Sequence, residues 1–329
     1  MRQALPLDHM RFGLLSLGDR QYQSFCQFGR SLHQWLAQQG AQSLFAPIEV
    51  DKTDPDALQR WRSALSQLAN GAAIEAPTEP QLQGWRLTGR RQLNPGSVGA
   101  PTWLVELEPP AGAIWQAGDI AVVQPGNEGT ERREYSIASI PEDGSLQLVV
   151  RQVTRTDGTA GSGSGWLTAG APIGSEVMLY IRENPSFHAP GDSRPVILIG
   201  NGTGIAGLRS ILKSRVHRGE QHNWLLFGER NAAHDFYLRD EIEAWRAAGL
   251  LPRLSLAFSR DQVTRLYVQD RLREEAAALR QWVDDGAAIY VCGSAEGMAQ
   301  EVDRVLEETL GRERLDELAA AGSYRRDVY

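Results

Sequence analysis

The stretch at residues 196–209, VILIGNGTGIAGLR, combines a short apolar run, a cluster of glycines and the start of a helix-like pattern. A buried strand that ends at glycines delivers backbone N–H groups and a helix N-terminus to one point, where an anion can bind. Gly200, Gly202 and Gly204 have no Cβ, so a pyrophosphate can approach the main chain around Thr203 closely. Alone, such a cluster is weak evidence for nucleotide binding. Its weight comes from further signals before and after it.

The segment Arg133–Ser136 brings a cation, an aromatic ring and a hydroxyl group onto one expected strand. Arg133 can pair with a phosphate, and Tyr135, two residues on, shares its face of the strand. The tyrosine ring can stack on a flat ring system, and the Ser136 hydroxyl can hydrogen-bond to a ring nitrogen. An exposed arginine beside an ordinary strand tyrosine would look the same, so the motif alone does not decide.

Residues 159–167, TAGSGSGWL, form a loop of small residues that contains Ser164. Successive backbone amides together with a serine hydroxyl can cradle a diphosphate. A surface loop has the same Gly and Ser composition, and the sequence leaves both interpretations open.

Ser259 and Arg260 follow an apolar, strand-like run, with Arg265 and Gln269 close behind. Two guanidinium groups and a hydroxyl at the carboxyl end of a parallel strand can bind the 2′-phosphate of NADPH. An enzyme that uses NADH more often places an acidic residue near the ribose. None dominates here, although Asp261 is adjacent. The alternative is a solvated loop with two basic side chains.

Cys292 lies at the end of a second apolar run, where ligands of open α/β sheets bind. It can contact a reacting nicotinamide, or it can be buried filler, as a lone cysteine often is. The six histidines are scattered without ligand spacing, so no metal site is expected. No Gly-x-Ser-x-Gly elbow marks a hydrolase.

Three segments with different hydropathy patterns must position these residues. Residues 191–329 alternate apolar runs with helix-like stretches, which predicts right-handed crossovers and a parallel sheet. Residues 81–190 contain short alternating runs punctuated by Gly and Pro, which predicts an antiparallel barrel. Residues 1–70 predict strand, helix, strand and helix, and residues 71–80 have linker composition. The predicted fold class is α/β plus a β-barrel.

The boundaries of individual elements follow from the same patterns. In the first segment we expect strands at 12–17 and 43–50 and helices at about 25–39 and 54–68. In the last segment we expect four helices. The first ends near 218, and the others lie around 238–248, 268–282 and 298–309.

The bulk properties exclude several classes of protein. The net charge of −7 and the absence of a block of like charge argue against nucleic acid as a partner. Two cysteines provide no disulfide framework. The amino-terminal residues lack signal-peptide architecture, and no window approaches the length of a membrane span. We therefore expect a cytoplasmic protein.

In these motifs and their order, the chain resembles the NADPH-dependent diflavin reductases, among them the sulfite reductase flavoprotein and cytochrome P450 reductase. The resemblance covers nearly the whole chain and implies a ferredoxin–NADP reductase-like arrangement, an FAD-binding barrel followed by an NADP-binding domain. The segments that carry it are 133–136, 179–190, 200–209, 227–230, 257–269, 290–293 and 326–329.

The resemblance implies a role for each motif. Arg133, Tyr135 and Ser136 match the FAD-binding motif, with the serine near flavin N5, and Ser164 lies where the family contacts the FAD diphosphate. Residues 200–204 match the NADPH pyrophosphate loop.

The remaining matches concern the other end of NADPH and the hydride transfer. The adenosine-phosphate site is matched by Ser259, Arg260, Arg265 and Gln269. Cys292 and Asp327 match residues that assist hydride transfer, and Tyr329 matches the aromatic residue that covers the flavin ring and moves aside for nicotinamide.

The chain departs from the family pattern in three places. Asn201 and Gly207 stand where the family usually has proline, so the loop loses rigidity but keeps its N–H groups. Only about fifteen residues separate Asp119 from Arg133, and the helical connecting domain of the larger enzymes is expected to be missing. Residues 17–26 match the last FMN loop of a flavodoxin, but the first phosphate loop has no counterpart, so the FMN site looks incomplete.

The favoured activity is hydride transfer from NADPH to FAD, followed by transfer of single electrons to FMN or to an external haem or iron–sulfur protein. One alternative is an FAD-only reductase that feeds a separate flavodoxin or ferredoxin. Another is an inactive fragment that acts in protein association through an apolar edge at residues 12–17.

Overall fold

The computed structural model describes residues 6–18, 25–51, 54–72, 74, 80–126, 131–155 and 157–329. The chain divides into two compact units, Met1–Pro80 and Gln81–Tyr329. Most of the linker predicted at 71–80 and residues 19–24 of the matched FMN loop lie outside the described residues.

The first unit is a small α/β structure in which each predicted strand is split in two. Its elements are β1 (Arg11–Phe12), β2 (Leu15–Gly18), α1 (Gln27–Gln38), β3 (Gln42–Ser43), β4 (Ile48–Asp51) and α2 (Pro55–Leu68). β1 pairs with β3 and β2 with β4, both in parallel. Helix α2 begins as predicted, because the Asp54 side chain accepts a hydrogen bond from the Asp56 N–H at 3.0 Å and Pro55 occupies the first turn.

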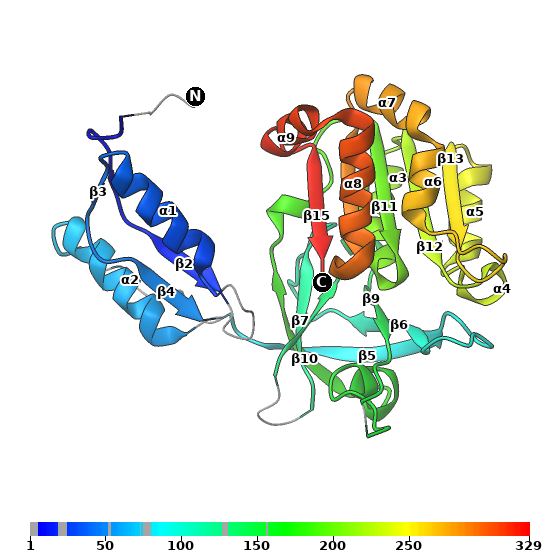
Figure 1. Ribbon diagram of the computed structural model, residues 1–329. Coiled ribbons are helices and arrows are strands. Elements are labelled where there is room, and N and C mark those ends of the chain that lie inside the picture. Colours follow the sequence, from blue (N-terminus) through cyan, green and yellow to red (C-terminus); the bar gives the residue numbers. More distant parts are fainter. Residues whose placement is uncertain are drawn as a thin grey trace. The chain divides into compact units, whose positions relative to one another are not determined.

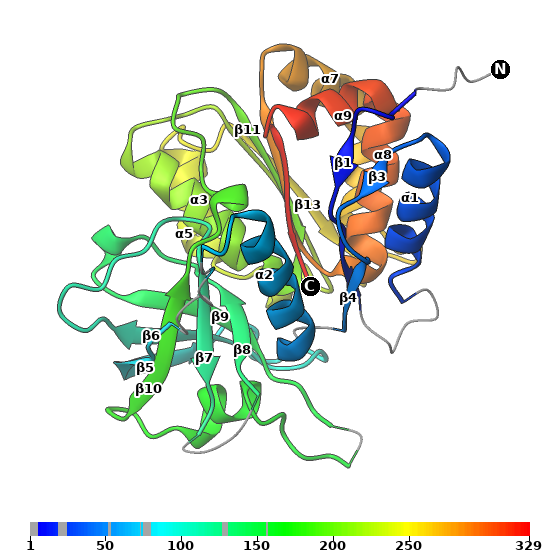
Figure 2. The same ribbon diagram turned by 90° about the vertical axis from the view of Figure 1, so that its left-hand side faces the viewer.

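The second unit begins with a six-stranded antiparallel barrel (Figure 2). Its strands are β5 (Gln83–Gln92), β6 (Thr102–Glu108), β7 (Ile120–Gln124), β8 (Arg133–Ser136), β9 (Leu146–Arg151) and β10 (Glu176–Arg182), in the order β8-β7-β10-β5-β6-β9. A bridge between Ile137 and Leu148 closes the ring. Strand β5 was not predicted, because only Trp85 and Leu87 mark its buried face among polar residues. β7 and β8 are neighbours joined by residues 125–132 alone, which leaves no room for an inserted domain there.

A parallel five-stranded sheet follows, as its alternating pattern predicted. Its strands are β11 (Val196–Asn201), β12 (Asn223–Glu229), β13 (Arg253–Phe258), β14 (Ala288–Gly293) and β15 (Tyr324–Val328), in the order β13-β12-β11-β14-β15. Its helices are α3 (Ile205–His217), α4 (Ala232–Asp235), α5 (Arg239–Ala247), α6 (Val268–Glu274), α7 (Ala276–Asp284), α8 (Gln300–Leu310) and α9 (Arg312–Ala320).

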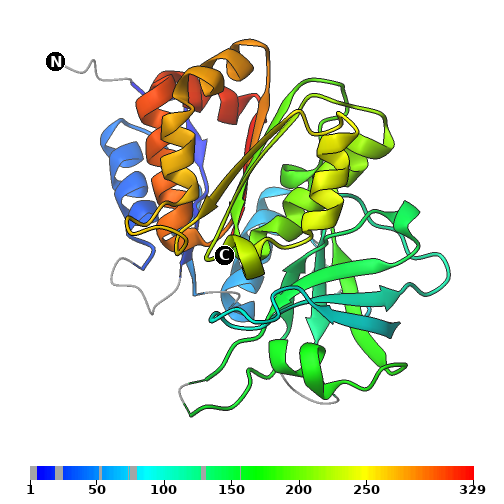
Figure 3. The same cartoon turned by 90° about the vertical axis from the view of Figure 1, so that its right-hand side faces the viewer.

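The helices cover both faces of this sheet (Figures 1 and 3). Helices α3 and α5 pack on one face, and their apolar core continues into the barrel through Leu104, Val149 and Phe187. Helices α6 to α9 pack on the other face. The barrel is thereby held against the α3 side of the sheet.

One expectation for this sheet was wrong, and two of its elements were missed. The single helix expected around 268–282 is two helices, α6 and α7, that meet at Glu275, where the backbone leaves the helical region (φ −100°, ψ 20°) and the carboxylate pairs with Arg253 on β13. Helix α9 and strand β15 were not predicted at all. Strand β15 matters for the site because it is the parallel neighbour of β14.

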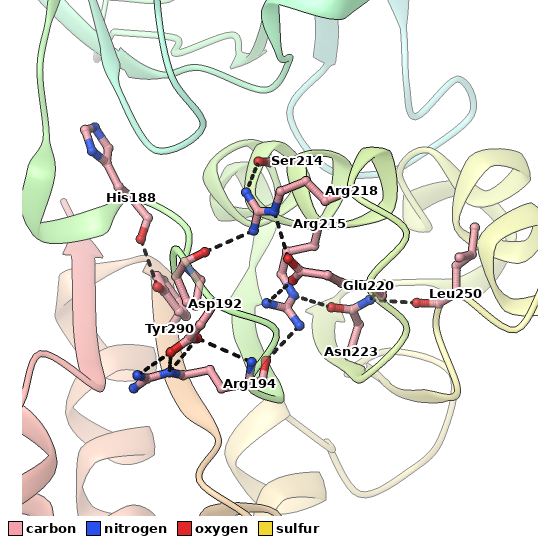
Figure 4. A network of polar contacts seen from close by, with 11 residues as sticks. His188, Asp192, Arg194, Ser214, Arg215, Arg218, Glu220, Asn223, Leu250 and Tyr290 are labelled. Atoms are coloured by element: carbon pink, nitrogen blue, oxygen red, sulfur yellow. Dashed lines mark hydrogen bonds and ion pairs between the residues drawn. The ribbon is translucent and has the colours of Figure 1, made fainter.

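A buried polar network holds the amino edge of the sheet (Figure 4). Arg215 of α3 is fully buried, and its Nε donates to Asn223 Oδ1 at 2.6 Å. Its Nη2 donates to the Arg194 carbonyl at 2.8 Å, and its Nη1 pairs with Glu220. These contacts join α3 to the starts of β11 and β12.

Replacing Arg215 with methionine is expected to lower the free energy of unfolding by about 3–5 kcal/mol, because Glu220 and Asn223 lose their buried partner. Chemical denaturation measures the change. Arg218→Met is the matched control: Arg218 contacts the same Glu220 from a side chain that is 38% exposed, so its loss is expected to cost about 1 kcal/mol or less. Equal effects of the two variants would contradict the argument.

Candidate active site

The carboxyl edge of the parallel sheet brings three predicted residues into one row. Strand pairing places Gly200 of β11 opposite Cys292 of β14, and Cys292 opposite Asp327 of β15. The Asp327 carboxylate accepts a hydrogen bond from Ser136 Oγ, at the end of barrel strand β8, at 2.7 Å. Cys292 Sγ lies 3.6 Å from the same oxygen. Ser136, Cys292 and Asp327, the three predicted catalytic residues, therefore form one cluster between barrel and sheet.

The cluster is organised around one carboxylate. Cys292 is completely buried, and this burial, with the adjacent Asp327 carboxylate as a further cause, raises the pKa of the thiol well above its ordinary value. The thiol therefore stays protonated and donates toward Asp327. This environment suits a neutral, polarisable side chain that packs against a ligand, and it disfavours a thiolate nucleophile.

A cavity of about 480 Å³ opens beside this cluster and gathers the residues predicted for FAD. Arg133, Tyr135, Ser136 and Ser164 line it, together with Tyr329. Burial raises the pKa of Tyr135 to about 12, so its hydroxyl remains a hydrogen-bond donor at neutral pH. A flat ring with a phosphate tail matches this lining of aromatic side chains, hydroxyls and arginine.

The small-residue loop forms one wall of this cavity. Ser164 Oγ accepts a hydrogen bond from the Val153 N–H at 2.9 Å, which ties the loop to the end of β9. Within the described part of the chain, the N–H groups of Ser162 and Gly163 donate to no protein acceptor. Two adjacent free N–H groups are suited to a diphosphate.

Tyr329 closes the other side of the cavity. Its hydroxyl lies 3.0 Å from Thr203 Oγ1 in the glycine loop. Its N–H donates to the Gly293 carbonyl at 3.1 Å, and its own carbonyl accepts from the Ala295 N–H at 2.9 Å. The ring is thus held between the glycine loop and the end of β14.

A second cavity, of about 470 Å³, lies at the ends of β12, β13 and β14. Ser259, Arg260 and Gln269 line it, as expected of an adenosine-phosphate site. Arg265 does not belong to this lining, so its predicted contact with the phosphate stays a prediction. Tyr267, which the sequence argument did not single out, lines the same cavity.

The glycines of the loop meet different demands from those expected. A Cβ at Gly200 would lie 2.4 Å from the Cys292 carbonyl oxygen, and one at Gly204 would lie 2.1 Å from it. These two glycines allow β14 to approach, whereas Gly202 has a positive φ of 56°. The loop runs directly into α3, so a helix N-terminus lies where the pattern predicted an anion site, and the binding of an anion there stays a prediction.

Asn201 and Gly207, which stand where the family usually has proline, both contact the region around the end of β14. Asn201 Oδ1 accepts a hydrogen bond from the Ser294 N–H at 3.2 Å and ties the glycine loop to the segment after β14. Gly207 faces Cys292, and a Cβ there would lie 3.2 Å from the sulfur. Asn201 thereby restrains the loop through a hydrogen bond that a proline side chain could not accept.

The first unit has a cavity of its own, of about 450 Å³. Leu17, Gly18, Phe25 and Cys26, all from the segment that matches the last FMN loop, line it. A Cβ at Gly18 would lie 2.9 Å from Cys26 Sγ, so the loop ends are packed closely.

Comparison with known proteins places these sites in context. Two family models match the chain, an oxidoreductase NAD-binding domain over residues 198–304 and a flavodoxin over residues 2–63. Over 214 residues the chain is 38% identical to the sulfite reductase (NADPH) flavoprotein alpha-component of Mannheimia succiniciproducens and 39% identical to that of Klebsiella pneumoniae. The chain is a homologue of the sulfite reductase flavoproteins.

These matches confirm the predicted resemblance and the fold class. They cover 60% of this chain and 36% of each relative, so the chain spans about a third of the length of these sulfite reductase flavoproteins. The alpha-component of Salmonella paratyphi A is 27% identical over the whole chain and 77% of its own length. That alignment has 468 positions against 329 residues here, so the relative contains segments that this chain lacks.

Two kinds of feature are absent from the part of the chain that the structure describes. No helix there is long and apolar enough to cross a bilayer. No group of three or more His, Cys, Asp or Glu side chains there is arranged to hold a metal ion.

Proposed function

We propose that the chain is an NADPH-dependent flavoprotein reductase that transfers a hydride from NADPH to FAD and passes electrons on to an acceptor protein. The Ser136–Asp327–Cys292 cluster carries the proposal, because Ser136 lines the cavity that suits a flavin and Cys292 lies on β14, the neighbour of the strand that leads into the glycine loop. The homology to NADPH-dependent sulfite reductase flavoproteins supports it independently.

The residues would hold the two nucleotides as follows. Arg133 and the small-residue loop bind the FAD diphosphate, and Tyr135 packs against the flavin. The α3 N-terminus binds the NADPH pyrophosphate, while Ser259 and Arg260, with Gln269, bind the 2′-phosphate. FAD, when bound, supplies the chemistry of accepting a hydride and releasing electrons singly.

The chain itself supplies position and charge for this transfer. Ser136 directs its hydroxyl hydrogen to Asp327, which fixes its oxygen at the cavity edge. The half-buried Asp327 carboxylate stabilises the positive charge that develops on nicotinamide. Tyr329 excludes water from the flavin side until nicotinamide takes its place.

The second cofactor and the acceptor belong to the same proposal. The flavodoxin match supports FMN in the first unit, at the cavity lined by Gly18 and Phe25. The acceptor is proposed to be a protein with a haem, an iron–sulfur cluster or a flavodoxin-type flavin. The domain boundaries at 70, 80 and 190 and the cytoplasmic location stay predictions.

Ferricyanide reduction tests the central claim. The FAD-loaded full chain is expected to reduce ferricyanide much faster with NADPH than with NADH, and equal rates would remove the 2′-phosphate assignment. Extraction of the bound cofactors then separates the alternatives. Equal amounts of FAD and FMN indicate a diflavin protein, and FAD alone indicates a reductase that feeds a separate carrier. A colourless protein that takes up no flavin indicates an inactive, associating fragment.

A further inference from the structure

The last strand, β15, is held in the sheet from one side. It is an edge strand, and in the described part of the chain it pairs with β14 alone. Side chains of alternate residues share a face of a strand, so Arg325, Asp327 and Tyr329 lie on one face. Asp327 contacts Ser136, and Tyr329 contacts Thr203. Arg325, which no part of the proposed reaction uses, occupies the third position on this face.

The guanidinium group of Arg325 contacts a short bridging segment, residues 184–188, that lies between the barrel and the sheet. Its Nη1 donates to the Pro185 carbonyl at 3.0 Å and to the His188 carbonyl at 3.3 Å. The Tyr290 hydroxyl of β14 donates to the same His188 carbonyl at 2.8 Å (Figure 4). The guanidinium carbon lies 5.8 Å from the centre of the Tyr290 ring. Arg325 therefore connects β15 to the bridging segment through backbone carbonyls.

The bridging segment is itself anchored on the barrel, directly before β7. The Asn184 N–H donates to Asp119 Oδ1 at 3.0 Å, and His188 Nε2 lies 2.6 Å from the same oxygen. The Asp119 side chain is only 3% exposed. A Cβ on Gly118 would lie 2.4 Å from the Phe187 carbonyl oxygen, so the two backbones are in direct contact. Strand β15 is thus tied, through this segment, to the start of β7.

The start of β7 also positions Ser136. Strand pairing places Ile120, the first residue of β7, opposite Ser136, and the Asp119 carbonyl accepts the Ile137 N–H at 3.0 Å. The contacts therefore form a closed ring. It runs from the start of β7 through the bridging segment and β15 to Asp327, and the hydrogen bond of 2.7 Å between Asp327 and Ser136 closes it.

We propose that Arg325 is a positioning residue for hydride transfer, which holds the Asp327 carboxylate at hydrogen-bonding distance from Ser136. Pairing with β14 fixes where Asp327 lies along the sheet, but a strand without a second neighbour depends on side-chain contacts for its distance from the barrel. Arg325 supplies such a contact two residues away, about 7 Å along the strand. The inference rests on the proposed function for the identity of the reaction.

Replacing Arg325 with glutamine is expected to lower the rate constant of flavin reduction by NADPH about 10- to 100-fold, because a small misplacement of a reacting group is costly. The KM of NADPH is expected to stay unchanged, since Arg325 lines neither nucleotide cavity. Anaerobic stopped-flow measurement gives the rate constant per bound flavin, so partial unfolding does not lower it. Arg325→Lys keeps a cationic donor for the carbonyls and is expected to restore most of the rate.

A double-variant cycle tests whether Arg325 acts through Asp327. Arg325→Gln/Asp327→Asn is expected to react as fast as Asp327→Asn alone, because the residue that Arg325 positions is already lost. Losses that multiply would mean that Arg325 acts by another route, and they would overturn the assignment. Arg326→Gln removes the neighbouring, exposed arginine of the same strand, and this matched control is expected to react at the wild-type rate.

Hydrogen exchange measured by mass spectrometry tests the contact without any cofactor. The backbone amides of β15 are expected to exchange faster in Arg325→Gln than in the wild type or in Arg326→Gln. Unchanged exchange in β15 would overturn the assignment, and so would an unchanged rate of flavin reduction in the active enzyme. If the wild-type chain reduces no acceptor but the exchange rises as expected, the reductase proposal fails and Arg325 stands as the residue that holds β15 in place.

Discussion

Replacing Asp327 with asparagine is expected to slow reduction of the bound flavin by NADPH about 100-fold, with little change in the KM of NADPH. The carboxylate accepts from Ser136 at 2.7 Å and from the Cys292 thiol at 3.6 Å, so it is the negative charge at the centre of the cluster. Loss of a preorganised group that stabilises developing charge lowers rates by about 10²- to 10³-fold. The proposed nucleotide contacts lie elsewhere, at the glycine loop and the Ser259 cavity.

Anaerobic stopped-flow measurement of the flavin absorbance separates the chemical step from nucleotide binding. Asp316→Asn, on the exposed face of α9, is the matched control and is expected to react at the wild-type rate. Ser136→Ala removes one donor and keeps the charge, so its loss should be smaller. If Asp327→Asn reacts as fast as the wild type, the carboxylate has no part in the hydride transfer.

Replacing Arg260 with glutamine is expected to raise the KM of NADPH about 10- to 100-fold and to leave the KM of NADH unchanged. Arg260 lines the nucleotide cavity next to Ser259, and in the described chain its guanidinium group has no carboxylate partner. A charged hydrogen bond to a phosphate contributes about 1.5–3 kcal/mol, which sets the expected factor. Steady-state kinetics with both nucleotides measure the change in preference.

Arg265→Gln is the informative comparison for this prediction. The sequence pattern groups Arg265 with Arg260, whereas in the structure only Arg260 lines the cavity. We therefore expect a smaller effect at Arg265. A larger rise in KM at Arg265 than at Arg260 would show that the loop between them rearranges around the phosphate. An equal rise for NADH and NADPH in either variant would contradict a 2′-phosphate contact.

The apolar runs predicted the buried strands well, because burial on both faces leaves a continuous signature. Val196–Asn201 and Ala288–Gly293 lie where the sequence placed them. Strand β15, with the sequence YRRDV, has no such signature, since it exists through its pairing with β14. The position of Asp327 beside Cys292 could therefore be inferred only by resemblance to a family.

Contacts between segments that are distant in the sequence could not be predicted either. Arg151 and Glu229 are 78 positions apart, and nothing local to either residue predicts that they meet. The glycines at 200 and 204 were singled out for pyrophosphate binding, which stays a prediction, whereas the constraint that the structure shows comes from the carbonyl of Cys292, which belongs to another strand. Side-chain types in a motif indicate which ligand fits, whereas tertiary structure decides which of them face it.

The direct main-chain contact between the glycine loop and Cys292 has a practical meaning for protein engineering. Because Gly200 and Gly204 leave no gap for a side chain there, the backbone of the loop packs directly against β14. We therefore expect few substitutions to be tolerated in that region if the protein is redesigned to change its turnover rate. Ser259 and Arg260 line the neighbouring cavity, so we expect substitutions there to change coenzyme preference while the Ser136–Asp327–Cys292 cluster is preserved.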